Sequence, residues 1–351
     1  MQTGTWGAAR RRDGSEFVAT MKEVAERAGV SITTVSHVIN QTRFVSEELA
    51  KRVRDAIDEL SYHPDQRARS LRVGKSETVA MLVTDIVNPF FPAVVRGSED
   101  CAREHGYSLI LCNTDENPSQ EELYVSLMME RRVDGFLVAP SMRPETTLKT
   151  LVDRGVPLVI IDRRSSLDVD QVYSDNEAGA YEAAKYLIDL GHRRIGAIVE
   201  LEGVPSFDDR VRGWKRALEE AGITAEDEWL RQAGLEVAGA TAAAAKLVGE
   251  SSPGVTAIFT TNNLMTLGTL EFFKSAGLHC PQDVSLVGFD DPKWAESFNP
   301  AITSVAQEPY EMGYRGAELL IKRIEGDESP PMNVCLDCVL RIRESSKPCG
   351  V

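Results

Sequence analysis

Short apolar runs alternate with amphipathic helical patterns through most of this chain of 351 residues. Short continuous apolar runs are typical of parallel strands that are buried on both faces of a sheet. Such a sheet needs helices on both sides, and the alternation supplies them, so the pattern predicts two doubly wound α/β halves. The apolar runs occupy residues 78–84, 108–113, 134–140, 157–162, 194–199, 256–261 and 284–289, and the helical patterns occupy residues 94–106, 120–131, 176–190, 208–222, 238–249, 264–276 and 310–325.

The beginning of the chain shows a different pattern, of three short helices. Thr20 is followed three residues later by Glu23, which is the capping-box signature of a helix that starts near residue 21. Gly29 supplies the positive φ of a tight exit turn, and Ser31 then caps a second helix. Ser46 starts a third. Two short helices joined by a tight turn, with a third behind them, are typical of a helix-turn-helix.

The second of these helices, residues 32–40, has one apolar and one polar side. Val35, Val38 and Ile39 lie on the side expected to face the other helices. The opposite side carries Ile32, Thr33, Ser36 and His37. We expect the apolar side to be buried and the polar side to be exposed.

These features resemble the DNA-binding headpiece of the lactose and galactose repressor family, and the resemblance continues through YHPDQRARSL. Within that family, the segment TTVSHVINQTRFVSEE is especially similar to the purine and ribose repressors. The resemblance implies a headpiece at residues 20–64 that reads DNA in the major groove. The alternative is three amphipathic helices that pack together and bind nothing. The residues implied to contact DNA are Ser31, Ile32, Thr33, Thr34, Ser36, His37 and Asn40.

Residues 65–75 form a linker whose first part is long enough for only about two turns of helix, which is marginal in water. The resemblance implies that DNA orders it: two hinge helices, one from each subunit of a homodimer, pair in the minor groove of a pseudo-palindromic operator. Leu71 would enter a base step, with Arg67, Arg69 and Arg72 at phosphates or in the groove. The alternative is a flexible basic linker. Asp65 stands where the family usually has Asn.

The net charge of −15 is distributed unevenly. Residues 1–75 hold 13 Lys and Arg against 10 Asp and Glu, and the remainder holds 26 against 44. A mildly basic N-terminal part, residues 1–75, followed by an acidic remainder is typical of a protein that contacts DNA phosphates only through its N-terminal part. Residues 1–19 are expected to be a disordered tail. We find no signal-peptide region or membrane span, and therefore expect a cytoplasmic protein.

Six cysteines are too few for a disulfide framework in a chain of this length. Cys335 and Cys338 form a single CxxC, without the two further ligands that a zinc site needs. We expect no metal and no cofactor. The simpler interpretation is that both thiols belong to one late strand, VCLDCVL.

The resemblance also implies the organisation of the α/β part, which in this family is similar to periplasmic sugar-binding proteins. It consists of two lobes, with the chain crossing between them near Asp175, Gln307 and Asp337. The implied ligand-binding and dimerisation domain is residues 76–351. Its lobes would be residues 76–175 with 308–336, and 176–307 with 337–345.

Polar side chains stand just after several of the apolar runs, where parallel strands end and α/β sheets leave a crevice. A carboxylate beside a guanidinium suits a ligand rich in hydroxyls. Arg210 is expected at the start of the helix at residues 208–222, and two phenylalanines would form an apolar floor. For each residue the alternative is structural capping of a strand end. The candidate effector-binding residues are Phe90, Phe91, Asp162, Arg163, Arg210, Asn262, Asp290 and Gln307.

Two positions bear on the class of ligand. Purine repressors have an arginine where this chain has Val204 and a phenylalanine where it has Leu235, which favours a carbohydrate, polyol or sugar derivative. A purine-type corepressor is the alternative, and Arg163 could also meet a sugar acid or phosphate. A nucleotide-dependent enzyme is disfavoured because there is no GxGxxG and Arg69 occupies the position of the first phosphate-loop glycine. We expect a ligand-responsive repressor.

Overall fold

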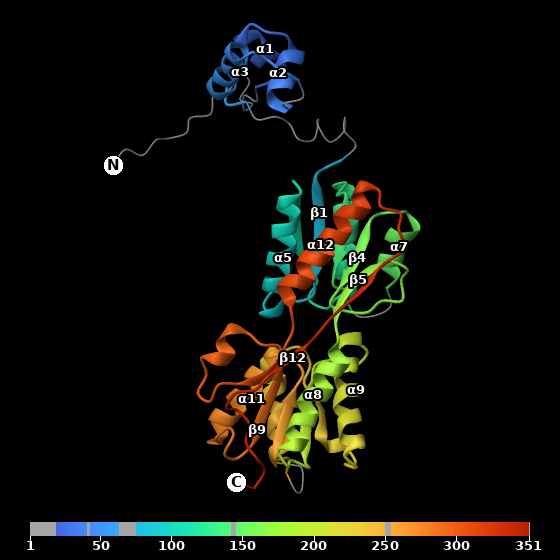
Figure 1. Cartoon of the computed structure of the whole chain (residues 1–351), viewed down its shortest axis with the longest axis vertical. Coiled ribbons are helices and arrows are strands. Elements are labelled where there is room, and N and C mark those ends of the chain that lie inside the picture. The colour runs from blue at the N-terminus through green and yellow to red at the C-terminus, as the bar shows by residue number, and fades with distance from the viewer. Residues whose placement is uncertain (1–18, 41–42, 63–74, 142–144, 250–253, 351) are drawn as a thin grey trace, which may run out of the picture. The chain divides into compact units, whose positions relative to one another are not determined.

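The computed structural model describes residues 19–40, 43–62, 75–141, 145–249 and 254–350. The chain divides into two compact units, residues 1–74 and 75–351, which are considered separately (Figure 1). The expected tail, except Ala19, lies outside the described residues. So do the hinge residues Arg67, Arg69, Leu71 and Arg72.

The first unit contains three helices: α1 (Met21–Ala28), α2 (Ile32–Asn40) and α3 (Glu47–Glu59). The capping box at Thr20 is present, because Glu23 Oε2 accepts from the Thr20 amide at 2.7 Å while the Thr20 hydroxyl accepts from the Glu23 amide at 3.3 Å. Gly29 has φ +63° and ends α1. The Ser31 hydroxyl accepts from the Thr34 amide at 3.0 Å and caps α2. Ser46 precedes α3 but forms no side-chain cap.

The core of this unit is small and built from short side chains. Val24, Val35 and Val53 are fully buried, and alanines on α1 and α3 allow the helices to approach closely. Ala19, expected in the tail, is buried in the same core. Ile32 and Thr33 on the polar side of α2 are exposed, as the sequence pattern predicts, whereas Ser36 and His37 are half-buried, like Val38 and Ile39 on the apolar side. The fold class of the headpiece is confirmed.

In the second unit, lobe 1 is built on a sheet with the strand order β11-β5-β4-β3-β1-β2, and every neighbouring pair is parallel. Helices α5 and α12 pack on one face, and α6 and α7 on the other. The central strands are buried on both faces, which explains their continuous apolar sequences. The strands are β1 (Thr78–Val83), β2 (Ser108–Asn113), β3 (Gly135–Val138), β4 (Leu158–Ile161), β5 (Asp170–Ser174) and β11 (Asn333–Leu336), and the helices are α5 (Phe90–Glu104), α6 (Pro118–Glu130), α7 (Thr146–Asp153) and α12 (Pro309–Glu325).

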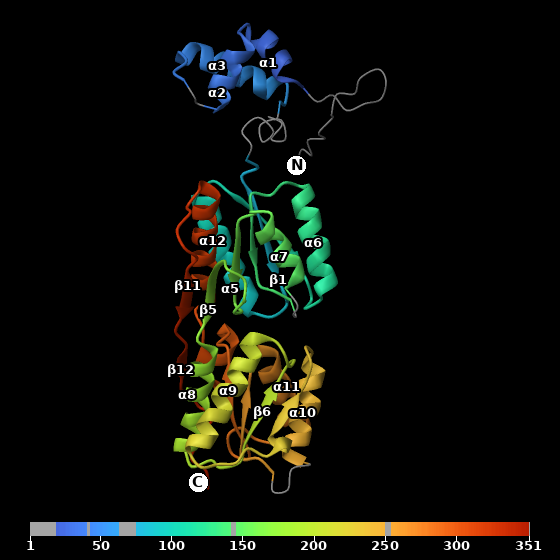
Figure 2. The ribbon, with the colours of Figure 1, turned by 90° about the vertical axis from the view of Figure 1, so that its right-hand side faces the viewer.

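Lobe 2 repeats this plan with the strand order β12-β10-β9-β8-β6-β7, in which only β12 is antiparallel to its neighbour. Figure 2 shows α8 and α9 to one side of β6 and α10 and α11 to the other. The two sheets correspond strand for strand, from β1 with β6 to β5 with β10. The strands are β6 (Ile195–Val199), β7 (Leu230–Gln232), β8 (Ala257–Thr260), β9 (Ser285–Phe289), β10 (Thr303–Ala306) and β12 (Val339–Arg341); the helices are α8 (Asn176–Asp189), α9 (Pro205–Glu220), α10 (Val237–Gly249) and α11 (Asn263–Ala276), with short 3-10 turns η1 (Asp227–Trp229) and η2 (Lys293–Glu296).

The chain passes between the two sheets three times: from β5 to α8, from β10 to α12, and from β11 to β12. The last passage corrects the interpretation of VCLDCVL as one strand. Its two halves pair with different sheets, β11 with β5 and β12 with β10, and Asp337 and Cys338 lie between them. The two-lobed α/β fold class is confirmed.

Glycines allow the helix backbones of lobe 1 to touch. A Cβ atom on Gly97 of α5 would lie 2.0 Å from the carbonyl oxygen of Tyr310, and one on Gly313 of α12 would lie 1.9 Å from that of Val94. Both distances are far shorter than a contact between a carbon and an oxygen atom allows, so neither position can hold a side chain. Helix α5 begins with Phe90 and Phe91, and α12 begins two residues after Gln307. The contact therefore fixes the starts of both helices relative to each other.

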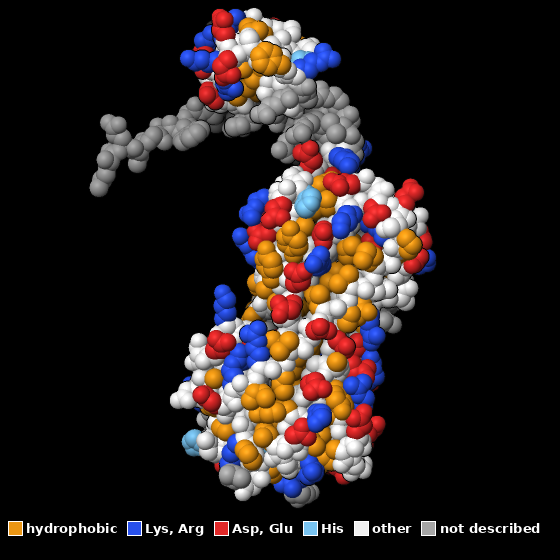
Figure 3. Space-filling model, viewed as in Figure 1, with side chains coloured by type: hydrophobic (Ala, Val, Ile, Leu, Met, Phe, Trp, Pro, Cys, Tyr) orange, Lys and Arg blue, Asp and Glu red, His pale blue; other side chains and the backbone are white. Residues whose placement is uncertain are grey.

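The surface of the second unit carries both signs of charge. On the face in Figure 3, acidic and basic side chains are intermixed rather than separated into patches. Many are paired along one helix, such as Arg315 with Glu311 at 2.7 Å on α12. Within the described part of the chain, no helix combines the length and apolar character needed to cross a bilayer.

Candidate functional site

One cavity of about 250 Å³ lies at the carboxyl ends of strands from both sheets of the second unit. All eight residues predicted to bind an effector line it. The cavity also has lining residues that the sequence pattern missed, including Asn88, Glu116, Ser206 and Phe207. Asp162 and Asp290 were selected because each is a polar residue just after an apolar run. Glu116 also closely follows such a run, at residues 108–113, so the same criterion would have found it. The predicted residues brought together are Phe90, Phe91, Asp162, Arg163, Arg210, Asn262, Asp290 and Gln307.

Asp162 and Asp290 occupy corresponding positions in the two lobes. Asp162 directly follows β4 and Asp290 directly follows β9, and both have left-handed backbones, with φ of 68° and 71°. Such a conformation is uncommon outside glycine and is concentrated at functional sites. Both carboxylates are buried, and burial raises the pKa of each. The turn after each strand thus directs a carboxylate into the cavity from each side.

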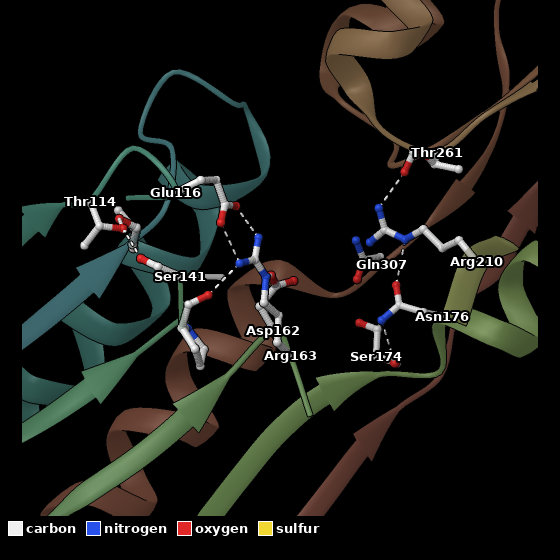
Figure 4. Close-up of polar contacts among 12 residues, drawn as sticks. Thr114, Glu116, Ser141, Asp162, Arg163, Ser174, Asn176, Arg210, Thr261 and Gln307 are labelled. Carbon is white, nitrogen blue, oxygen red and sulfur yellow. Dashed lines mark hydrogen bonds and ion pairs between the residues drawn. The ribbon is translucent and has the colours of Figure 1, made fainter. Parts of the chain in front are cut away.

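Arg163 is held by groups of its own lobe (Figure 4). Its guanidinium donates to both carboxylate oxygens of Glu116, one of them at 2.8 Å, and to the carbonyl of Pro140 at 2.5 Å. Asp162 Oδ2 lies 3.4 Å from its Nε. Burial disfavours the charge on Arg163, but the carboxylates, Glu116 first among them, raise its pKa. Arg163 therefore stays charged at every physiological pH.

Arg210 projects from lobe 2 and is held by different partners. Its Nε donates to Asn176 Oδ1 at 2.8 Å, its Nη1 donates to the Thr261 carbonyl at 2.5 Å, and the guanidinium lies 3.9 Å from the ring centre of Phe289. The expectation that Arg210 opens its helix is wrong. Helix α9 begins at Pro205, because proline is favoured in the first turn, so Arg210 lies in the second turn.

The amide side chains have more than one role. Gln307 Nε2 donates to Asp290 Oδ1 at 2.5 Å, so the residue at the second passage between lobes orients a cavity carboxylate. Asn262 accepts from the Met265 amide at 2.9 Å and caps the start of α11, a structural role other than the strand-end cap considered above. Asn263 Nδ2 donates across the lobes to Asn88 Oδ1 at 3.1 Å. The amides therefore contribute to the cavity wall and to the contact between the lobes.

Aromatic rings form the apolar part of the cavity. Phe90 and Phe91 contact edge to face, with ring centres 5.2 Å apart. Phe207 lies opposite on α9, and the guanidinium carbons of Arg163 and Arg210 are 5.6 and 5.8 Å from its ring centre. Leu235 also lines the cavity, whereas Val204 does not. The rings can cover the carbon face of a small ligand while the acids and amides meet its polar edge.

Glu200 is a fully buried carboxylate behind this wall. Its Oε2 accepts from the Thr261 hydroxyl at 2.5 Å, and its Oε1 has no hydrogen-bond partner among the described residues. Burial raises the pKa of Glu200 to about 7, against the opposing effect of Arg210. The neutral form is thus favoured in the folded protein well above the pH at which an unfolded chain would ionise.

Glu200→Gln should stabilise the protein above neutral pH by about 2 kcal/mol, because the variant has no buried carboxylate to ionise. The raised pKa contributes stability below the unfolded pKa, and this contribution is lost as pH rises towards 7. Thermal unfolding at pH 5 and pH 8 measures the effect. We expect near equality at pH 5 and a gain at pH 8; equal gains at both would exclude ionisation as the cause.

The described residues contain no group of three or more His, Cys, Asp or Glu arranged to hold a metal ion. The six cysteines are free; Cys335 lies in β11 and Cys338 in the passage between β11 and β12.

In the headpiece, the predicted DNA-contacting residues share the outward side of α2 and the turn before it. Ser31, Ile32 and Thr33 are exposed, with Ile32 49 % exposed, and Thr34, Ser36, His37 and Asn40 are half-buried. Asn40 Nδ2 donates to the Ser36 carbonyl at 2.8 Å, so part of its amide is used within the helix. Phe44, which follows α2 in the chain, was not among the predicted DNA-contacting residues, and its side chain is 96 % exposed.

Known proteins match both units. Residues 20–65 match the bacterial regulatory proteins of the lacI family, and residues 184–346 match the periplasmic binding protein-like domain. The HTH-type transcriptional repressor PurR of Vibrio vulnificus is 40 % identical over 315 residues, covering 89 % of this chain and 93 % of the relative. The chain belongs to the lacI family. The predicted family is confirmed.

Solved structures of the family share this fold. The transcriptional regulator CelR in complex with cellobiose is 31 % identical with a TM-score of 0.72, and covers 93 % of this chain and all of that one. A lacI-family regulator from Enterococcus faecium with bound ribose is 31 % identical with a TM-score of 0.70, covering 77 % and 99 %. The lac repressor bound to operator shares the fold, with a TM-score of 0.85 at 22 % identity.

This lacI-family protein is a DNA-binding transcriptional repressor, as expected. Its relatives are repressors and not enzymes, so the nucleotide-dependent enzyme is excluded. The particular residues that contact DNA and effector stay predictions.

His37→Arg is expected to change the base preference of the headpiece. A guanidinium donates two hydrogen bonds to guanine in the major groove, whereas an imidazole makes one. Selection of operators from a random DNA library with parent and variant measures the difference. Identical selected sequences would show that His37 reads no base.

Proposed function

We propose that this lacI-family repressor responds to an uncharged carbohydrate of monosaccharide size, bound in the cavity between its lobes. The observation that carries the proposal is the charge arrangement of the wall. Five carboxylates and two guanidiniums line the cavity, and the guanidinium of Arg163 is already paired with Glu116. An anionic ligand would meet an acidic wall with one of its two cations occupied.

Hydroxyl groups complement the atoms that remain. Asp162 and Asp290 accept hydrogen bonds, and Arg210 donates them, while a hydroxyl can do both. Three buried atoms of cavity residues have no hydrogen-bond partner within the described structure: Nε of Arg163, Oγ of Ser206 and Oε1 of Gln307. A ligand with several hydroxyls can satisfy such donors and acceptors at once. A purine base has no hydroxyl, so each of its ring nitrogens or its carbonyl either donates or accepts, and none does both.

The size of the cavity favours one sugar ring. Its volume of about 250 Å³ lies below the roughly 300–1,000 Å³ usual for drug-sized ligands. Among the similar structures, one holds ribose and another cellobiose. The small cavity fits the first class better than a disaccharide.

A purine-type corepressor is the second candidate, because the relatives named PurR are up to 40 % identical. Phe90, Phe91 and Phe207 could cover a flat base. Against it, the resemblance implies that purine repressors have a phenylalanine at the position of Leu235, which lines the cavity; the arginine implied at Val204 carries less weight, because Val204 does not line it. The five carboxylates of the cavity wall also present more hydrogen-bond acceptors than the few N–H donors of a purine base can satisfy.

The proposed mechanism couples the cavity to DNA through the passages between the lobes. Arg210 is tied to Asn176, the first residue after one passage, and Asp290 to Gln307 at another. A ligand bound to both acids and to Arg210 changes how the lobes meet, and so how a homodimer binds a pseudo-palindromic operator. A coupling of about 1–3 kcal/mol would change operator affinity roughly 5- to 150-fold.

A thermal-shift screen of the full chain tests the proposal, with neutral pentoses and hexoses, their phosphates, sugar acids, hypoxanthine and guanine as probes. A neutral sugar at about 100 times its Kd should raise Tm by on the order of 5 °C. It should also change operator affinity in a fluorescence anisotropy assay. A shift with purines alone would favour the second candidate and overturn the first.

A further inference from the structure

Glu116 lies in an unusual turn between β2 and α6. It and its neighbour Asp115 both have left-handed backbones, with φ of 54° and 51°. Two consecutive non-glycine residues in this region are strained, and such strain persists only where the surroundings enforce it. The turn directs the Glu116 carboxylate inward, towards the cavity wall.

The carboxylate reaches Arg163 and engages two of its nitrogens. Both side chains are almost fully buried, with 3 % of Arg163 and 6 % of Glu116 exposed. The carbonyl of Pro140 takes a further hydrogen bond from the same guanidinium. Nη1 and Nη2 of Arg163, the donor fork of its guanidinium, both donate hydrogen bonds. Of its three nitrogens, only Nε lacks a hydrogen bond within the described residues.

Charge balance alone does not require Glu116. Asp162 already lies 3.4 Å from Arg163, and Asp290 lies near Arg210. Among the buried residues of the cavity wall, the carboxyl groups of Glu116, Asp162 and Asp290 outnumber the guanidiniums of Arg163 and Arg210. A paired donor fork matches carboxylate and phosphate alike, so without Glu116 the fork of Arg163 would be available to an anionic ligand.

We propose that Glu116 determines the charge selectivity of the effector site. Its carboxylate occupies the donor fork of Arg163, so that uncharged sugars bind and their phosphates and acids do not. The inference rests on the proposed function and adds to it a residue that rejects a ligand class. Rejecting a competitor by a built-in repulsive group is a usual source of specificity.

The experiment compares the full-length parent with Glu116→Gln. The matched control is Glu121→Gln, which removes another buried carboxylate that accepts from the Ser141 amide and not from Arg163. A double variant, Glu116→Gln with Arg163→Gln, removes the fork as well. Calorimetry measures the binding of inorganic phosphate and D-ribose 5-phosphate at matched ionic strength, and circular dichroism verifies folding.

Glu116→Gln should bind both anions about 10- to 100-fold more tightly than the parent, the range of one or two charge-assisted hydrogen bonds. Glu121→Gln and the double variant should behave as the parent. No gain in Glu116→Gln, an equal gain in Glu121→Gln, or a gain that survives in the double variant would each overturn the proposal. So would a parent that already binds the anions tightly.

Two further measurements keep the test decisive. If Glu116→Gln does not fold, Glu116→Asp replaces it; its shorter carboxylate should give a smaller gain, and no gain would overturn the proposal. A separate titration of the parent with D-ribose and D-glucose addresses the proposed function. Binding of neither sugar would count against that function, while the phosphate results would still decide the role of Glu116.

Discussion

Replacing Arg163 with methionine should lower the free energy of unfolding by about 3–5 kcal/mol, the usual cost of leaving one partner of a buried ion pair uncompensated. Glu116 would keep its buried carboxylate, and no other cation among the described residues forms an ion pair with it. Methionine is chosen because its length and flexibility fill most of the space that Arg163 leaves. The expected loss is therefore electrostatic rather than a cavity effect.

Urea unfolding followed by far-UV circular dichroism measures this loss. Arg154→Met is the control, because Arg154 is exposed at the end of α7. The double variant Glu116→Gln with Arg163→Met should recover more than half of the loss, since it removes both charges. A loss below about 1 kcal/mol in the single variant would show that Glu116 is not an uncompensated charge there.

Asp162→Asn and Asp290→Asn should each weaken the response of operator binding to the effector at a fixed effector concentration. Each carboxylate is a buried acceptor in the cavity, and losing its charge should weaken effector binding by about 1–3 kcal/mol, or roughly 5- to 150-fold. Asparagine is the correct replacement. Both backbones are left-handed, which asparagine tolerates and alanine does not, so alanine would add strain to the measured effect.

Calorimetry with the neutral sugar found in the screen gives the affinity, and anisotropy with labelled operator gives the response. Asp283→Asn is a matched control at an exposed position between α11 and β9. Operator affinity without sugar should stay at the parental value in all three variants. Unchanged sugar affinity in Asp162→Asn and Asp290→Asn would make these residues structural caps of their strand ends.

The sequence pattern predicted the centre of each lobe better than its edges. Apolar runs such as residues 78–84 stood out because their strands are covered on both faces. β7 and β12 have three residues each and are largely polar or exposed, so no local signal marks them. Helix α7 was missed for a similar reason, since it is short and begins with two threonines, which favour other conformations.

The candidate site was predictable where it depends on position along a strand, and not where it depends on a distant partner. Asp162 and Asp290 were found because each follows an apolar run, and the structure places both at the cavity. The partners of the arginines were not found. Glu116 meets Arg163 across 47 positions of sequence, and Asn176 meets Arg210 across 34, so only the folded chain brings them together.

The three passages of the chain between the lobes also affect the order in which the lobes fold during translation. Lobe 1 begins at β1, but its face beneath α5 is completed only by α12, whose Met312, Leu320 and Ile321 belong to that core. All the strands and helices of lobe 2 except β12 are translated in between. At about 5–20 residues per second, the ribosome needs roughly 7–30 s to pass from β5 to the end of α12. During that interval the part of this apolar face that α12 covers stays exposed, so lobe 2 is expected to be the first to fold.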